Sequence, residues 1–307
     1  MRLEIGKVVE VAIDWITENL AGFFSFIKSI LTQVIDGFEW MFNILPFWAF
    51  IILFSLLALK LSNYKVAIFT GVGLVLIYAM DLWSPAMATL ALVGTAALLA
   101  LLMGLPLGII MAKSDKADKV IRPVLDFMQT MPAFVYLIPA VYFFGLGPVP
   151  GAIATIIFAM PPIVRLTNLG IRQVPQEVIE ASKSFGATSA QMLFKVQIPL
   201  AVPTILAGLN QTIMLSLSMV VISAMISSGG LGENVLFGIN RMQIGVGFEA
   251  GLAVVILAMI LDRITQSIGN QQEMFSFTKF FKSVVAKITK ALAKAKMDDK
   301  ASDDKKS

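Results

Sequence analysis

The side chains best placed to recognise another molecule lie in a short polar stretch between two apolar runs. The triplet Glu180-Ala181-Ser182 is followed after three residues by Gly186, and after twelve more by Pro199. A glycine there permits a sharp turn or a close approach of two backbones. A proline suits the first turn of a following helix. The pattern indicates docking on a partner rather than the making or breaking of bonds.

The same stretch predicts a hairpin of two short helices. Pro175 is a suitable start for the first helix, and Gly186 marks a break after it. Thr188 or Ser189 would then cap the second helix. An exposed Phe185 beside the turn would fit a groove on a partner. The alternative is a surface hairpin that binds nothing.

The rest of the chain offers little to catalysis. It contains no Cys and no His, which removes disulfides, thiolate chemistry, zinc sites and imidazole acid–base chemistry. A Gly-rich phosphate-binding loop is also absent from the sequence. We therefore expect no catalytic residue, no metal and no cofactor on this chain, and energy supplied by another chain or by an ion gradient.

Composition indicates a membrane protein with several spans. Only 14% of the 307 residues are charged, where soluble domains carry about 25%, and the mean hydropathy is +0.83. A bilayer core about 30 Å thick needs roughly 20 apolar residues per helix. We therefore expect an all-α fold with about seven transmembrane helices, at about 44–60, 65–82, 86–112, 131–146, 149–168, 202–226 and 249–268.

The expected organisation has four parts. Residues 1–43 form an amphipathic scaffold, residues 44–84 two peripheral spans, residues 85–268 a core that includes the 169–201 loop, and residues 269–307 a basic tail.

Charge predicts the orientation of these spans. If the 169–201 loop is cytoplasmic, its side also carries Lys60, Lys65, Lys113, Lys116, Lys119, Arg122, Arg165, Arg172, Lys183 and Lys195, followed by Arg263 and the Lys-rich tail. The other side carries four basic residues, Arg2, Lys7, Lys28 and Arg241. Because short cytoplasmic loops are rich in Lys and Arg, we expect the N-terminus outside and the C-terminus in the cytoplasm.

Both ends of the chain show amphipathic patterns. Apolar residues recur at helical spacing over 8–45, which indicates helices lying on the outer leaflet or, alternatively, packing against the protein's own bundle. A second stripe over 277–292 is edged by lysines and could bind anionic lipid. The alternative for that tail is a solvated segment without function.

The expected spans carry no charge at their centres, which argues against a carrier driven by protons or ions. A sodium-coupled carrier stays as an alternative, because Ser216, Ser218 and Ser223 lie in one span. Such serines commonly bond their own helix backbone instead.

Longer motifs carry a family resemblance. The loop resembles the permease consensus E-A-A-x3-G-x9-I-x-L-P, with Ser182, Val196 and Ile198 as small departures. The runs RPVLDFMQTMPAFVYLIP (122–139), PPIVRLTNLGIR (161–172) and NQTIMLSLSMVV (210–221) are similar to the glycine betaine/proline betaine permeases of ABC importers. The resemblance covers roughly residues 85–268, and the two ends of the chain are only loosely similar.

The resemblance implies a homodimeric permease of the type I importer fold in a bacterial inner membrane. Its partners would be a second copy, two cytoplasmic ATPase subunits that hold the ATP and Mg²⁺, and an extracytoplasmic binding protein, with no nucleic acid. The residues that would couple to the ATPase are Glu180, Ala181, Ser182, Phe185, Gly186, Ala187 and Pro199. The outer gate and pathway would involve Gly229, Gly230, Leu231, Gly232, Ser216 and Ser218.

The resemblance leaves the solute open among small quaternary amines and related compounds. The alternatives to the betaines are choline, carnitine and trimethylamine N-oxide. A betaine-binding aromatic cage would belong to the binding protein rather than to this chain.

Overall fold

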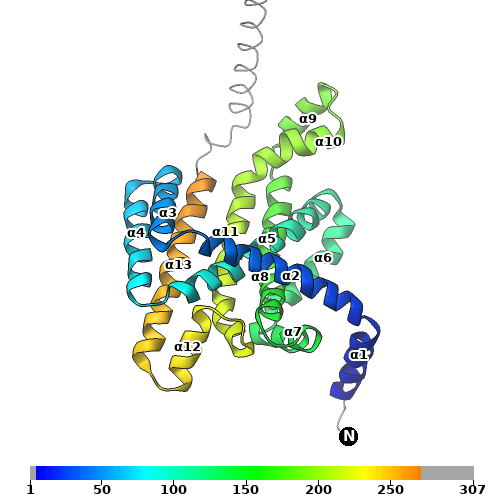
Figure 1. Ribbon diagram of the computed structural model, residues 1–307. Helices are drawn as coiled ribbons and strands as arrows, with labels where there is room; N and C mark the ends of the chain where they lie inside the picture. Colours follow the sequence, from blue (N-terminus) through cyan, green and yellow to red (C-terminus); the bar gives the residue numbers. More distant parts are fainter. Residues whose placement is uncertain (1–4, 271–307) are drawn as a thin grey trace, which may run out of the picture. The chain divides into compact units, whose positions relative to one another are not determined.

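Every regular element over residues 5–270, the part of the chain that the computed structural model describes, is a helix (Figure 1). Residues 1–269 form one unit and residues 270–307 a second. The tail and its stripe over 277–292 lie outside the described residues. The long helices are α1 (Ile5–Asn19), α2 (Ala21–Asn43), α3 (Phe47–Leu61), α4 (Tyr64–Ala79), α5 (Trp83–Lys113), α6 (Asp115–Thr130), α8 (Pro148–Arg172), α11 (Ile198–Ser223) and α13 (Ile244–Asn270). The shorter elements are η1 (Ala133–Tyr136), α7 (Leu137–Phe144), α9 (Gln176–Ser184), α10 (Ser189–Met192), η2 (Leu193–Gln197), η3 (Ala224–Ile226) and α12 (Leu231–Asn240).

The centre of the unit is built from α5, α8 and α11. Small residues let these helices approach closely, as is common in membrane bundles. A Cβ at Gly108 of α5 would lie 2.5 Å from Cβ of Thr167 on α8. A Cβ at Gly208 of α11 would lie 3.1 Å from Cα of Ile163, also on α8. The helix α8 is therefore fixed between its two neighbours.

A second group consists of α3, α4 and α13. Phe50 and Ala58 of α3 share a buried cluster with Leu74 of α4 and Ala253 of α13. The helix α13 is also joined to α11 by a hydrogen bond in which the side-chain amide of Asn210 donates to Oδ1 of Asp262 at 2.9 Å.

The number of spans is lower than the seven expected, although the all-helical fold is confirmed. Within the described residues, four helical stretches are long and apolar enough to cross a membrane, namely Trp83–Lys113, Pro148–Arg172, Ser189–Ile226 and Ile244–Ile268. The number rises to six if two bent pairs each count as one span: α2 with α3, bent by 95°, and α6 with η1 and α7, bent by 107°. The helix α4 has 16 residues and so measures about 24 Å, short of a bilayer core.

The amphipathic N-terminal segment forms two helices, and one of them packs on the bundle. Leu31 and Ile35 of α2 are buried against residues of α5, α7, α8 and α11. The ammonium of Lys28 donates a 2.8 Å hydrogen bond to the carbonyl of Phe144 at the end of α7. Phe26 and Trp40 of α2 are exposed. Packing against the protein's own bundle thus accounts for one face of α2, and for the exposed face the outer-leaflet interpretation stays a prediction.

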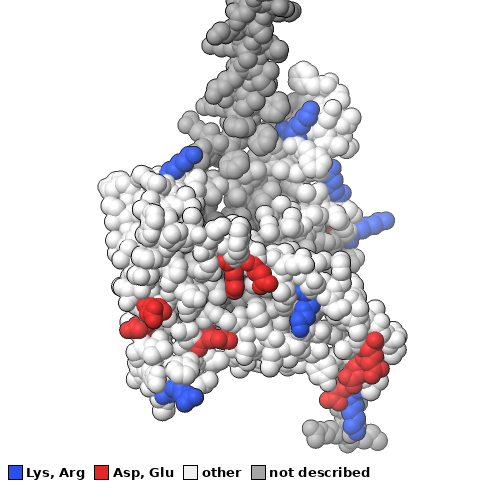
Figure 2. Space-filling model, in the orientation of Figure 1, with Lys and Arg blue, Asp and Glu red and all other residues white. Residues whose placement is uncertain are grey.

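The two ends of the first unit differ in structure and charge. The hairpin of α9 and α10 lies at one end, and α7 and α12 lie at the other (Figure 1). Acidic side chains gather over α1 and α2, while basic side chains occur near the end that carries α9 and α10 (Figure 2).

Candidate functional site

The predicted hairpin is present as α9 and α10, joined by the turn 185–188. Pro175 precedes α9 in an extended conformation, with φ −55° and ψ 136°, so the helix begins immediately after it. No side chain of α9 is buried. The side chains of α9 are therefore accessible to a partner.

The turn ends α9 at a glycine, as the sequence predicts. Gly186 has φ +76°, a left-handed conformation that residues with a Cβ rarely adopt. The N–H of Gly186 donates to the carbonyl of Lys183 at 2.9 Å, and the N–H of Ala187 donates to the carbonyl of Ser182 at 3.1 Å. These bonds satisfy carbonyls at the end of the helix. A Cβ at Gly186 would meet nothing within 4 Å, so the need for glycine comes from the backbone and not from crowding within this chain.

Thr188 rather than Ser189 caps the second helix. Its Oγ1 accepts from the N–H of Gln191 at 3.3 Å, and its own N–H donates to Oε1 of Gln191 at 2.9 Å. This reciprocal pair is a capping box, which satisfies two backbone donors at the start of α10.

The hairpin combines an anchored base with an exposed tip. Met192 and Leu193 are buried at its base, and Leu193 joins a core cluster with Ile171 of α8 and Ala201 of α11. At the tip the side chain of Phe185 is 92% exposed. A phenyl ring that stands in the open at a turn is suited to a partner's apolar groove.

Glu180, Ala181 and Ser182 share the middle of α9. Glu180 and Ala181 are exposed, whereas the hydroxyl of Ser182 donates to the carbonyl of Val178 at 2.7 Å within its own helix. Pro199 lies in the first turn of α11, which begins at Ile198. A π-turn, Leu193–Gln197, leads into that helix, because Pro199 has no N–H to continue the α-helical ladder.

The residues expected at the outer gate lie at the opposite end from α9 and α10 (Figure 1). Gly229 and Gly230 both have positive φ, at +83° and +76°. The N–H of Leu231 donates to Oγ1 of Thr89 on α5 at 2.8 Å, and Leu231 and Gly232 are buried. The turn is thus fixed against the start of α5.

The two serines expected in the pathway lie on different faces of α11. Ser216 is buried and its hydroxyl donates to the carbonyl of Thr212 at 2.9 Å. Ser218 is exposed and its hydroxyl donates to the carbonyl of Met214 at 3.1 Å. Both hydroxyls are occupied by their own helix, so the structure does not bring them together as a site.

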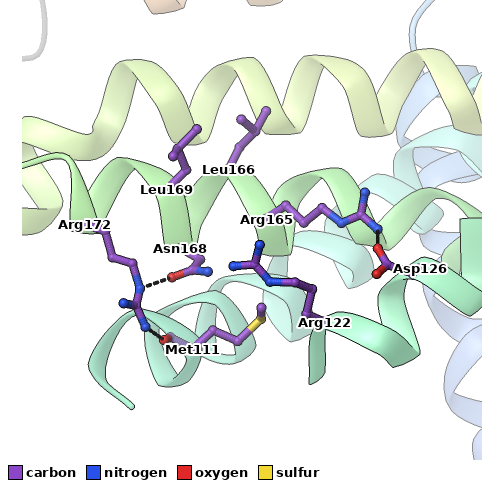
Figure 3. Close-up of a pocket in the computed structure, with 8 residues that line it drawn as sticks. All are labelled: Met111, Arg122, Asp126, Arg165, Leu166, Asn168, Leu169 and Arg172. Atoms are coloured by element: carbon purple, nitrogen blue, oxygen red, sulfur yellow. Dashed lines mark hydrogen bonds and ion pairs between the residues drawn. The ribbon is translucent and has the colours of Figure 1, made fainter. Parts of the chain in front are cut away.

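A polar cluster near the base of the hairpin was not anticipated from the sequence. A cavity of about 420 Å³ is lined by Arg122 and Asp126 of α6 and by Arg165, Asn168 and Arg172 of α8 (Figure 3). The guanidinium of Arg165 pairs with the carboxylate of Asp126 at 2.5 Å. In the sequence the three arginines counted as charges of the cytoplasmic side and all five residues as parts of the family motifs, but nothing brought them together as a cluster. Their spacing of three and four residues along each helix is the signal that would have placed them on facing stripes.

Comparison with known proteins identifies the chain's family. Residues 104–270 match the family described as binding-protein-dependent transport system inner membrane component. The chain belongs to this family. It is 52% identical over 269 residues to the glycine betaine/carnitine transport permease of Listeria monocytogenes, covering 86% of this permease and 95% of that relative. It is 53% identical over 261 residues to the glycine betaine/proline betaine transport system permease of Escherichia coli, covering 85% of this permease and 74% of that relative.

A solved structure supports the fold of the permease. An inward-facing form of the MetNI methionine ABC transporter matches with a TM-score of 0.55 and 22% identity, covering 61% of this chain and 95% of that chain. At this identity the likeness concerns the fold alone. The expected type I importer permease fold and the expected family are confirmed, and the permease is an inner-membrane transport subunit.

Proposed function

We propose that this permease is the membrane subunit of an ATP-driven importer for glycine betaine and proline betaine. The observation that carries the proposal is the identity of 52% and 53% to two permeases whose names both include glycine betaine, over more than four fifths of this chain. Carnitine, choline and trimethylamine N-oxide are the other solutes to be compared, and carnitine is also named for the Listeria relative.

The hairpin of α9 and α10 is the proposed docking element for a cytoplasmic ATPase. Its exposed Phe185 and the glycine turn beside it form a projecting tip, while Leu193 roots the hairpin in the core. A displacement of the ATPase would therefore move the end of α8 and the start of α11. ATP and Mg²⁺ would be held on the ATPase, not on this chain.

The proposed orientation places α9 and α10 in the cytoplasm and α7 and α12 outside. Basic side chains near the hairpin agree with the distribution expected of cytoplasmic loops (Figure 2). Because α2 packs on the end of α7 through Lys28, the N-terminal helices would lie on the outer side. The C-terminal tail would then begin in the cytoplasm, after α13.

Three further partners complete the proposal. A second copy of this chain would form the other half of the pathway, and the family's description as binding-protein-dependent supports an extracytoplasmic binding protein. The turn Gly229–Gly232 lies on the outer side in this orientation and would contribute to the outer gate. Lipid would cover exposed apolar residues of the helices, such as Leu56 of α3 and Val72 of α4.

Uptake by the reconstituted complex tests this function. Proteoliposomes holding the permease and its ATPase would receive ATP inside, with binding protein and labelled solute outside. We expect glycine betaine to accumulate only with ATP and both partners present. Accumulation driven by a sodium or proton gradient alone would contradict the proposal, and preferential uptake of choline or carnitine would reassign the solute.

A further inference from the structure

Three contacts cross between α6 and α8 and form a ladder. The guanidinium of Arg165 pairs with Asp126 at 2.5 Å, the side-chain amide of Asn168 donates to Oδ1 of Asp118 at 2.9 Å, and the guanidinium of Arg172 pairs with Asp115 at 2.8 Å. As the residue numbers rise along α8, those of the partner residues on α6 fall. The helices therefore run antiparallel, and the three rungs lie along one shared seam.

The middle rung is the most enclosed. Asn168 is 5% exposed, and the side chain of Asp118 is 16% exposed. Asn168 is itself held on its other side, because Nε of Arg172 donates to its Oδ1 at 2.9 Å. Arg172 also donates to the carbonyl of Met111 at 2.7 Å near the end of α5 (Figure 3). The last turns of α8 are thus joined to both α5 and α6.

The position of the ladder relative to α9 gives it a mechanical role. Arg172 is the last residue of α8, and only residues 173–175 separate it from the first residue of α9. Val174 is buried within that connection. Of the two connections of the hairpin to the bundle, this one would carry a displacement of α9 to Arg172 and to its rung with Asp115.

The ladder is also a main attachment of α6. Within α6, all of which the structure describes, Leu125 is the one buried side chain. Val120, Val124 and Phe127 of the same helix are exposed. The polar rungs and Leu125, together with the half-buried Ile121 and Met128 that pack against the same cluster, thus hold α6 to the rest of the unit.

Beyond α6 the chain turns sharply into η1 and α7. The bend between α6 and this pair is 107°. It is closed by a hydrogen bond in which the hydroxyl of Tyr136 donates to the carbonyl of Met128 at 2.5 Å. A movement of α6 therefore reaches α7, on the side of the molecule away from the hairpin.

We propose that this ladder transmits displacement of α9 to α6 and α7, so that Asn168, Asp118 and the flanking ion pairs are positioning residues for coupling. The proposal rests on the proposed function, in which an ATPase moves α9. Because the ladder residues lie away from the hairpin tip, removing a rung leaves docking intact. It weakens the link between each cycle of ATP hydrolysis and each movement of the pathway.

The experiment measures solute imported per ATP hydrolysed in the reconstituted complex. The neutral variants Arg165→Gln and Asp126→Asn remove one rung at a partly exposed site, where folding tolerates the change. Asn168→Leu removes the enclosed rung, and Arg165→Asp with Asp126→Arg exchanges the charges. The matched control is Lys119→Gln, which removes an exposed positive charge of α6 that takes part in none of the three rungs.

We expect the ladder variants to retain the ATPase and to import about threefold to tenfold less solute per ATP. The exchanged pair should recover most of the wild-type ratio, which a general loss of folding would not do, and the control should keep it. A wild-type ratio in every assembled ladder variant would overturn the ladder's role. Failure of the unaltered complex to bind an ATPase or to import would instead refute the proposed function.

Discussion

The backbone N–H of Leu231 donates a 2.8 Å hydrogen bond to Oγ1 of Thr89, a residue 142 positions earlier in the chain. The hydroxyl of Thr89 in turn donates to the carbonyl of Pro85 at 2.9 Å. Thr89 and Leu231 are both buried. This hydroxyl therefore satisfies a backbone amide that would otherwise lack a partner at the start of α12. The contact fixes the 227–230 turn on the first turns of α5.

Replacing Thr89 by Val tests that contact. The substitution keeps the shape of the side chain but leaves the amide of Leu231 without an acceptor, at a cost of about 1–3 kcal/mol. We expect a lower Tm for the purified permease in detergent. Thr89→Ser retains the hydroxyl and should unfold near the wild-type temperature. Equal Tm values for the Val and Ser variants would show that the hydrogen bond does not hold the turn.

Two adjacent glycines allow a substitution that causes steric overlap to be compared with one that does not. Gly229 and Gly230 both have positive φ, but a Cβ at Gly229 would meet nothing within 4 Å, whereas one at Gly230 would lie 2.5 Å from Oγ1 of Thr89 and 3.3 Å from its Cα. Gly229→Ala should cost about 1 kcal/mol through the backbone alone. Gly230→Ala should cost clearly more, because atoms overlap and because φ +76° with ψ −166° is a conformation open essentially to glycine alone. Thermal unfolding of both variants gives the comparison. Similar Tm values would mean that the turn moves freely away from α5.

Phe185 should matter for docking and not for folding. Its ring is 92% exposed, so Phe185→Ala removes almost no contact within this chain. We expect an unchanged Tm, and affinity for the ATPase weakened by about 2 kcal/mol if the ring is a central contact. The control is Met242→Ala, since Met242 is 89% exposed after α12, at the other end of the unit. Unaltered binding of the ATPase by the Phe185 variant would remove this ring from the docking surface.

Substitutions at Gly186 distinguish the effect of backbone strain from that of a clash with a docked partner. A leucine at Gly186 has open space within this chain but must adopt φ +76°, which costs about 1–2 kcal/mol. We expect Gly186→Leu to insert in the membrane and to lose the co-purifying ATPase, because the added bulk meets the partner. Gly186→Asn adopts the same φ more readily and has a shorter side chain, so it should retain more of the ATPase. Full ATPase recovery with the Leu variant would exclude a close approach at this turn.

Local patterns in the sequence predicted the hairpin well. Pro175, Gly186 and Thr188 act within a few residues of themselves, through fixed φ values and short-range hydrogen bonds, so their consequences can be derived from the order of residues. For the same reason each expected span coincides with a helix. The bend before η1 was missed, although Pro132 disfavours a helical conformation at Met131, and this gave a signal for it.

Contacts between distant segments could not be derived in this way. Arg165 and Asp126 are 39 residues apart, and Thr89 and Leu231 are 142 apart. Helical spacing says which side chains share a face, but it does not say which face of another helix they meet. The count of four to six helices long enough to span, beside the about seven expected, has a related reason. Hydropathy measures how apolar a segment is, whereas the length of α4 and the bend after α6 decide how far each segment reaches.

Site-specific crosslinking tests the central claim most directly, because the natural chain has no cysteine. A single cysteine, Ala187→Cys in the hairpin or Asn240→Cys at the end of α12, would carry a photoactivated crosslinker in the assembled complex. The account predicts a crosslinked ATPase from position 187 and a crosslinked binding protein or no product from position 240. An ATPase crosslink from position 240, or none from position 187 in a complex that still imports solute, would contradict the account.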